Sequence, residues 1–135
     1  MTMNKPIIGP GTLNVYPQDK FDSLIIQHVT GLATQSSARH PEGVLAEINT
    51  ILMLVQGDIS DAENDAIEKL IQQGVTELAQ AKPVPKNAPD YDVQHFWAVK
   101  KRTSALMYLV QASKLLVRSL NDNEILKPKR RGGTK

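Results

Sequence analysis

Apolar residues recur at three- and four-residue steps along most of this chain, which is the spacing of one face of an α-helix. The longest such pattern runs from Asp90 to Leu120 and contains no glycine or proline. If it is fully helical, it spans about 46 Å at ~1.5 Å per residue. Asp90 is a residue type that favours the N-cap, so we expect its carboxylate to accept hydrogen bonds from the first turn.

The same periodicity predicts three shorter helices before this one. Their expected ranges are Gln18–Thr34, Pro41–Gln56, and a third helix that starts near Ser60 and continues through Leu78. The link between the second and third helices is short, so these two should form an antiparallel hairpin.

Local signals mark the ends of these helices. Pro41 suits the first helical position, where its missing N–H costs little, and Ser60 and Glu63 have the spacing of a capping box. Gly57 is suited to a left-handed position after a helix. Gly74 lies near the apolar face of the third helix, where it either allows a close approach of another helix or is simply a tolerated glycine.

The organisation follows from where the periodicity stops. Residues 82–89 read KPVPKNAP, with three prolines and no helical period, and residues 1–17 hold three prolines and two glycines. At 135 residues we expect one domain. The expected fold is all-α, with four helices: an extended arm (1–17), a three-helix body (18–81), a proline-rich linker (82–89), the long helix packing on the body (90–121), and a basic disordered tail (122–135).

The composition limits where the protein can be located and which class of protein it can belong to. There are no cysteines, which excludes disulfides and thiolate metal sites. No stretch approaches the ~18 uninterrupted apolar residues of a transmembrane helix, and the first residues do not have the pattern of a signal peptide. We therefore expect a cytoplasmic protein that makes no contact with a membrane.

Two helices are more apolar than one buried face requires. Residues 51–55 read ILMLV and residues 105–110 read ALMYLV, so that a methionine in each run extends onto the wider face of its helix. A second subunit could cover this surface, although single exposed apolar residues are also common on soluble proteins. We expect a homo-oligomer. The candidate interface residues are Met53, Phe96, Trp97, Met107 and Tyr108.

Charge is distributed unevenly along the chain. Residues 1–89 contain six Lys/Arg and ten Asp/Glu, whereas residues 90–135 contain ten and four. Such asymmetry is typical of proteins that contact nucleic acid through one end, but it also fits a solvated helix face with a solubilising tail. The candidate phosphate-contacting residues are Lys100, Lys101, Lys114, Arg118, Lys127, Lys129, Arg130 and Arg131.

Recognisable chemistry is otherwise missing from the sequence. The three histidines, His28, His40 and His95, lie outside metal-binding motifs, and we interpret His28 as a hydrogen-bonded residue at the edge of the core. Asp92 and His95 share a helix face, where a surface hydrogen bond is a more ordinary outcome than a metal site. There is no phosphate-binding loop and no nucleophile elbow. We expect no catalytic residues, no metal, no cofactor and no small-molecule substrate.

Two functional hypotheses remain. The first is a non-enzymatic, oligomeric helical accessory protein that contacts DNA or RNA non-specifically through its basic tail, as packaging, replication or partition factors of phages and plasmids do. This comparison is an analogy at the level of the fold. The alternative is a protein-binding adaptor, inhibitor or assembly component without a nucleic-acid role, which would use the methionine-containing faces.

Overall fold

The computed structural model describes residues 17–125, and all regular secondary structure in this range is α-helical. The helices are α1 (Pro17–Ser37), α2 (Pro41–Leu54), α3 (Asp61–Gln80) and α4 (Tyr91–Asp122). The predicted all-α fold of four helices is thus confirmed. The expected arm up to residue 16 and the basic segment from residue 126 lie outside the described residues.

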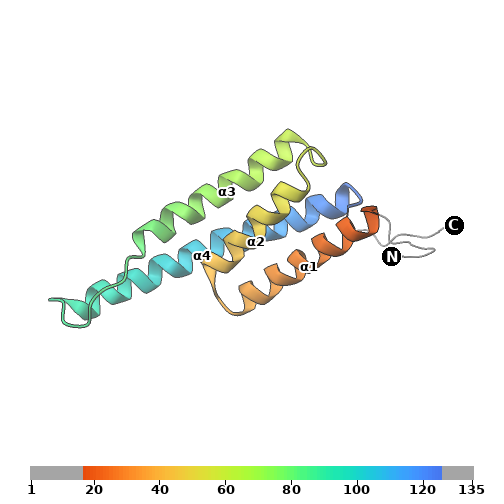
Figure 1. Cartoon of the computed structure of the whole chain (residues 1–135). Coiled ribbons are helices and arrows are strands. Elements are labelled where there is room, and N and C mark those ends of the chain that lie inside the picture. Colours follow the sequence, from red (N-terminus) through yellow and green to blue (C-terminus); the bar gives the residue numbers. More distant parts are fainter. Residues whose placement is uncertain (1–16, 126–135) are drawn as a thin grey trace, which may run out of the picture.

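The helices pack as two hairpins of unequal length (Figure 1). The longer one pairs α3 with α4, and the shorter one pairs α1 with α2 and lies against α4, mainly through α2. α2 and α3 run in opposite directions across their short turn, but each has a different helix as its main neighbour. α4 is therefore the helix that all the others contact.

The core lies between these hairpins and consists of aliphatic side chains. Because aromatic residues are only 4% of the sequence, the buried volume is filled by Ile, Leu, Val and Ala from all four helices. Burial of such side chains stabilises the fold by ~25 cal/mol per Å² of apolar surface. The fully or nearly fully buried members are Ile25, Leu32, Val44, Ile48, Ile51, Val55, Ile67, Ile71, Leu109, Ala112, Leu116 and Leu120.

The start of α3 is fixed by the predicted capping box. The backbone N–H of Ser60 donates to Glu63 (2.9 Å) and the backbone N–H of Glu63 donates to the Ser60 hydroxyl (3.1 Å). These contacts, with a further hydrogen bond from Asn123, lower the pKa of Glu63. Nδ2 of Asn123, just after α4, lies 3.2 Å from both Glu63 carboxylate oxygens. The capping box therefore also joins the first turn of α3 to the end of α4.

Pro41, Gly57 and Gly74 occupy the kinds of positions that the sequence indicates for them. Pro41 occupies the start of α2, and Gly57 adopts φ 87° in the turn that follows this helix. Gly74 is buried against α4, where an added Cβ would lie 2.8 Å from Cγ of Leu109 and 3.4 Å from the carbonyl oxygen of Ala105. The close approach of α3 and α4 thus depends on the missing side chain of Gly74.

The expectation that the Asp90 carboxylate caps α4 is wrong. Asp90 has left-handed backbone angles (φ 59°, ψ 30°) and its side chain makes no capping hydrogen bond. Asp is among the residues that tolerate this conformation, which lets the chain turn sharply from Pro89 into the helix. Nε2 of Gln94 donates to the Pro89 carbonyl at 3.3 Å, so a residue inside the helix makes the contact with the incoming chain.

Candidate functional site

The first three turns of α4 project beyond the α1–α2 hairpin (Figure 1). The α1–α2 turn meets α4 near Arg102, which pairs with Glu42 at the start of α2. Along α4 the first buried residue is Ala105. The neighbours of the projecting turns are the end of α3 and the link that follows it, as in the contact between Lys101 and Glu77. This part of α4 therefore leaves most of its surface to solvent.

Four large apolar side chains are exposed on these projecting turns, and we call them the aromatic end: Val93, Phe96, Trp97 and Val99. Their exposed fractions are 70%, 65%, 53% and 48%. An aromatic side chain such as that of Phe96 or Trp97 buries roughly 150–250 Å² when a partner covers it. The exposure of these rings therefore leaves a large apolar surface in contact with water. Clustered exposed apolar groups typically mark a surface that binds a partner.

The direction of Phe96 explains its exposure. At about 100° per residue, Ala98, Ala105 and Leu109 fall within about 40° of the side of α4 directly opposite Phe96. Ala105 and Leu109 are fully buried and face Gly74 of α3. Phe96 consequently points away from the core, and a change of side-chain rotamer does not bring it inside.

Cationic side chains surround Trp97. The Nζ atoms of Lys100 and Lys101 lie 5.8 Å and 5.2 Å from the centre of its ring, within the range of a cation–π interaction. Lys101 also donates to Glu77 of α3 at 3.2 Å, whereas Lys100 is exposed. One turn earlier, Tyr91 stacks on His95 with ring centres 5.1 Å apart. Trp97 therefore has two ammonium groups near its ring while about half of its surface stays exposed.

A shallow apolar depression of about 570 Å³ adjoins the aromatic end. It is formed between the first turns of α4 and the chain that leaves α3. Its lining residues are Gln80, Lys82, Val84, Val93, Gln94, Phe96, Trp97 and Ala98. A pocket of this size, bordered by exposed rings, fits an apolar side chain from a partner better than it fits a polar ligand.

The candidate phosphate-contacting residues on α4 do not form one group. Lys100, Lys114 and Arg118 are exposed and fall within about 40° of one another around the helix, and we call them the basic stripe. They have no acidic partner among the side chains of residues 22–125. Lys101 faces α3 and is paired with Glu77. The four tail cations from Lys127 to Arg131 lie outside the described residues.

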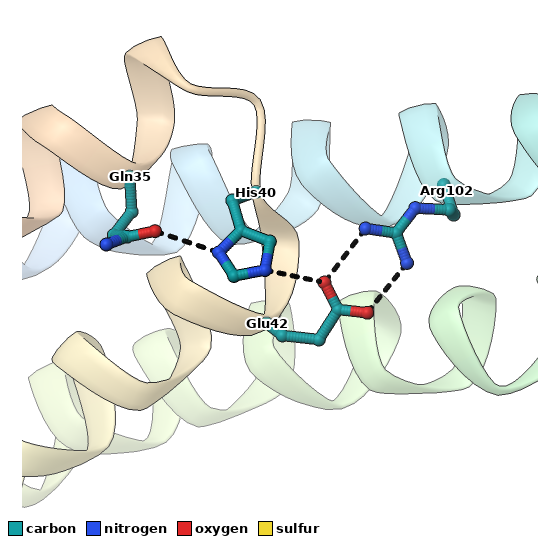
Figure 2. Close-up of polar contacts among 4 residues, drawn as sticks. All are labelled: Gln35, His40, Glu42 and Arg102. Atoms are coloured by element: carbon teal, nitrogen blue, oxygen red, sulfur yellow. Dashed lines mark hydrogen bonds and ion pairs between the residues drawn. The ribbon is translucent and has the colours of Figure 1, made fainter.

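The strongest ion pair of the described chain joins the α1–α2 turn to α4 (Figure 2). Arg102 donates through Nη1 and Nη2 to the two carboxylate oxygens of Glu42, at 2.6 Å and 2.9 Å. These hydrogen bonds lower the pKa of Glu42 from 4.5 to about 2. His40 lies beside the pair, with Nε2 3.6 Å from Glu42 and Nδ1 2.9 Å from Gln35. The arrangement fixes where the α1–α2 hairpin ends along α4.

The candidate interface residues are distributed over three places. Phe96 and Trp97 lie together in the aromatic end, while Met107 is 58% exposed on the same side of α4, about 16 Å further along the helix axis. Tyr108 is half-buried. Met53 is 77% exposed beside the α2–α3 turn, at the end of the molecule far from the start of α4 (Figure 1).

Two residues of the aromatic end, Val93 and Val99, were not among the sequence-based candidates. Each lies three residues from Phe96, one before and one after it. A projection of the helix around Phe96 would have found them, because both fall within about 60° of it. What such a projection lacks is the position of the α1–α2 hairpin along α4, which decides whether this face is covered.

The histidines do not form a metal centre in the part of the chain described. His28 lies 2.6 Å from Glu47 across the α1–α2 interface, which confirms its interpretation as a hydrogen-bonded residue at the core edge. Residues 17–125 contain no group of three or more His, Asp or Glu side chains placed to hold an ion. None of the described helices is long and apolar enough to cross a bilayer.

Comparison of the chain with protein-family models, with curated proteins and with solved structures gave no match. Function is therefore inferred from the surfaces of α4.

Proposed function

We propose that this protein is a non-enzymatic, cytoplasmic accessory factor that contacts nucleic acid non-specifically through α4 and the basic tail, and works as an oligomer. The observation that supports it is the basic stripe. Lys100, Lys114 and Arg118 project from one side of a continuous helix, without acidic partners in the described range, and the chain continues from this helix into the cationic tail.

The geometry of the basic stripe suits phosphate contact without base readout. Lys100 and Arg118 are eighteen residues apart, which corresponds to about 27 Å along the helix axis. Cations at this separation can contact phosphates along a duplex groove, where they release bound counterions and fix position but carry no sequence information. The proposed binding is therefore sensitive to salt and indifferent to sequence.

A mobility-shift titration of duplex DNA at several salt concentrations tests this function. With about four tail cations engaged, log K falls against log salt with a slope near −3.6 from the tail alone. Replacing Lys127, Lys129, Arg130 and Arg131 by Gln in the full chain removes this part. Lys114→Glu with Arg118→Glu reduces the magnitude of the slope by about 1.8 more.

The matched control reverses two exposed lysines away from the basic stripe, Lys69→Glu with Lys86→Glu, and so changes the net charge equally. This control should bind more tightly than the variant altered at Lys114 and Arg118. Equal weakening by both pairs would show that only net charge matters, and failure of the unaltered chain to bind at low salt would contradict the proposed function.

The alternative function, a protein-binding module, is favoured by a different observation. The aromatic end combines exposed Phe96 and Trp97 with an apolar depression, and aromatic residues of this kind dominate the energetics of protein interfaces. The two functions separate in one comparison. Phe96→Ser, which adds no charge beside Lys100, should leave the mobility shift unchanged if α4 and the tail bind nucleic acid, and should abolish binding of a partner if the aromatic end is the functional surface.

A further inference from the structure

The residues around Phe96 have a two-fold symmetric pattern on the exposed face of α4. Val93 and Val99 lie three residues before and after Phe96, and Asp92 and Lys100 lie four residues before and after it. All five side chains are exposed. At about 100° per residue they fall within 60° of Phe96 on either side, opposite the face that packs on α3.

This pattern is self-complementary if two copies of α4 pair in opposite directions. With a two-fold axis beside Phe96, residues equally far before and after it come to the same level across the pair. Asp92 and Lys100 lie about 40° to either side of Phe96, so the carboxylate of one copy and the ammonium group of the other come within reach across the seam, twice over because the interface is isologous. Val93 and Val99 lie about 60° to either side of Phe96 and border this contact along its two edges. A parallel pairing would instead place each of these charges against its own copy.

We propose that the aromatic end is a self-docking surface, on which a second copy of this chain packs antiparallel through Asp92, Val93, Phe96, Val99 and Lys100. The complementary charges are the reason for proposing a second copy of the chain as the partner on this surface. Asp92 has no hydrogen-bond or ion-pair partner among residues 17–125, and Lys100 has only the ring of Trp97. Opposite charges across an interface fix its register and disfavour alternatives in which like charges meet.

The shape of the molecule permits this packing. The α1–α2 hairpin ends beside Arg102, so the turns before it are free of other helices on the Phe96 side (Figure 1). An antiparallel pair places the two hairpin bodies at opposite ends of the dimer. Trp97, which lies about 100° around the helix from Phe96, borders the contact together with the apolar depression of each copy.

The contact is short, since it covers about three helical turns on each copy. Interfaces of this size are at the lower limit for specific association, so the dimer should dissociate on dilution. Lys100 then serves the dimer, and contact with phosphates falls to Lys114, Arg118 and the tail. The inference deepens the self-association within the proposed function, but it does not require that nucleic acid be bound.

Sedimentation velocity of the full chain over a wide range of concentrations tests the docking, with the mass of one chain at 14.9 kDa as reference. The unaltered chain should approach twice this mass as its concentration rises. Phe96→Glu, at an exposed position that leaves the helical content by circular dichroism unchanged, should weaken association by roughly 30-fold or more, as expected for an aromatic residue at the centre of an interface. Met53→Glu, at an equally exposed apolar residue far from α4's first turns, is the matched control and should have no effect.

Charge exchange tests the antiparallel direction. Asp92→Lys and Lys100→Asp, made singly, each bring like charges together and should weaken association by about 5-fold or more. The double variant restores opposite charges in the antiparallel pair and should recover the association of the unaltered chain. In a parallel pair each of these charges already meets its own copy, so neither the single variants nor the double variant would change the association.

Three results would overturn the inference. They are an unaltered chain that stays monomeric at every concentration, a dimer that Phe96→Glu does not disturb, and a double variant that fails to recover. The mobility shift reports separately on the proposed function. A monomeric Phe96→Glu chain that still binds duplex retains nucleic-acid contact, and a dimer that does not bind duplex removes that function while leaving the docking intact.

Discussion

The two parts of α4 differ in what surrounds them, although one continuous helix forms both. From Ala105 to Leu120 the helix lies against the other three, and Leu109, Leu116 and Leu120 are fully buried. From Tyr91 to Ser104 no residue is buried, and Phe96 and Trp97 face solvent. Both parts carry large apolar side chains, and the position of the α1–α2 hairpin along α4 decides which of them are covered.

This difference assigns separate tasks to the two parts of one helix. Large buried aliphatic groups contribute ~1.5–3 kcal/mol each to the fold, whereas an exposed ring contributes little until a partner covers it. The first part therefore supplies a surface that is held in place by the second. Substitutions should reveal the same division, with effects on unfolding in one part and effects on association in the other.

The largest contrast in stability should be between Leu116→Ala and Phe96→Ala. Leu116 is fully buried among the four helices, so its truncation removes burial and leaves a cavity, at a cost of about 2–5 kcal/mol in the free energy of unfolding. Phe96→Ala should change this free energy by less than about 0.5 kcal/mol when measured on the monomer. Urea unfolding at low protein concentration gives both values. Equal destabilisation by the two substitutions would contradict the division of α4 into a buried and an exposed part.

A smaller effect is expected where α3 approaches the buried part of α4. Gly74→Val places methyl groups where even a Cβ would lie 2.8 Å from Cγ of Leu109. Overpacking of this kind costs about 1–3 kcal/mol, and the two helices have to separate to relieve it. Thermal unfolding measures the loss. Ala79→Val, at an exposed α3 position near its end, is the control for the valine itself and should change stability far less.

The smallest effect concerns the ion pair at the boundary between the two parts. Arg102 holds the pKa of Glu42 at about 2, below its ordinary 4.5, so the folded state binds this proton less readily than the unfolded state does. The pair therefore stabilises the fold above pH 4.5, and this contribution is lost as the pH falls toward 2. Since about half of the Glu42 side chain is exposed, solvent screening limits the contribution to about 0.2–1 kcal/mol.

Glu42→Gln should remove that part of the pH dependence. Stability curves of the unaltered chain and of this variant, measured by urea unfolding from neutral pH downward, should converge as the pH approaches 2. If the two curves stay parallel over this range, the ion pair does not contribute in the way that the geometry implies.

Features governed by neighbours in sequence could be predicted before the structure. The helical ranges, the capping box of Ser60 and Glu63, the position of Pro41 and the left-handed turn at Gly57 all follow from local periodicity and local backbone chemistry. Gly74 was anticipated as a point of close approach, though only as one of two alternatives. These signals act over a few residues, so they can be recognised in the sequence without knowledge of the fold.

Features set by distant residues could not be predicted. Asp often caps a helix through its side chain, but Asp90 instead adopts a left-handed conformation at the sharp turn from the proline-rich link. The sequence places Lys101 among the candidate phosphate-contacting residues, but Glu77, 24 residues away in sequence, pairs with it in the fold. Arg102 likewise pairs with Glu42, which is 60 residues away. The exposure of Val93 and Val99 depends on where the α1–α2 hairpin packs along α4, and no local pattern encodes that position.

Hydrogen–deuterium exchange along α4, measured at a low and a high concentration of the full chain, tests this division most directly. Amides from Ala105 to Leu120 should be strongly protected at both concentrations, because opening them requires the core to unfold. Amides between Val93 and Lys100 should exchange faster at low concentration and gain protection at high concentration as a second copy docks. Uniform protection along the whole helix, independent of concentration, would contradict both the division of α4 and the self-docking surface.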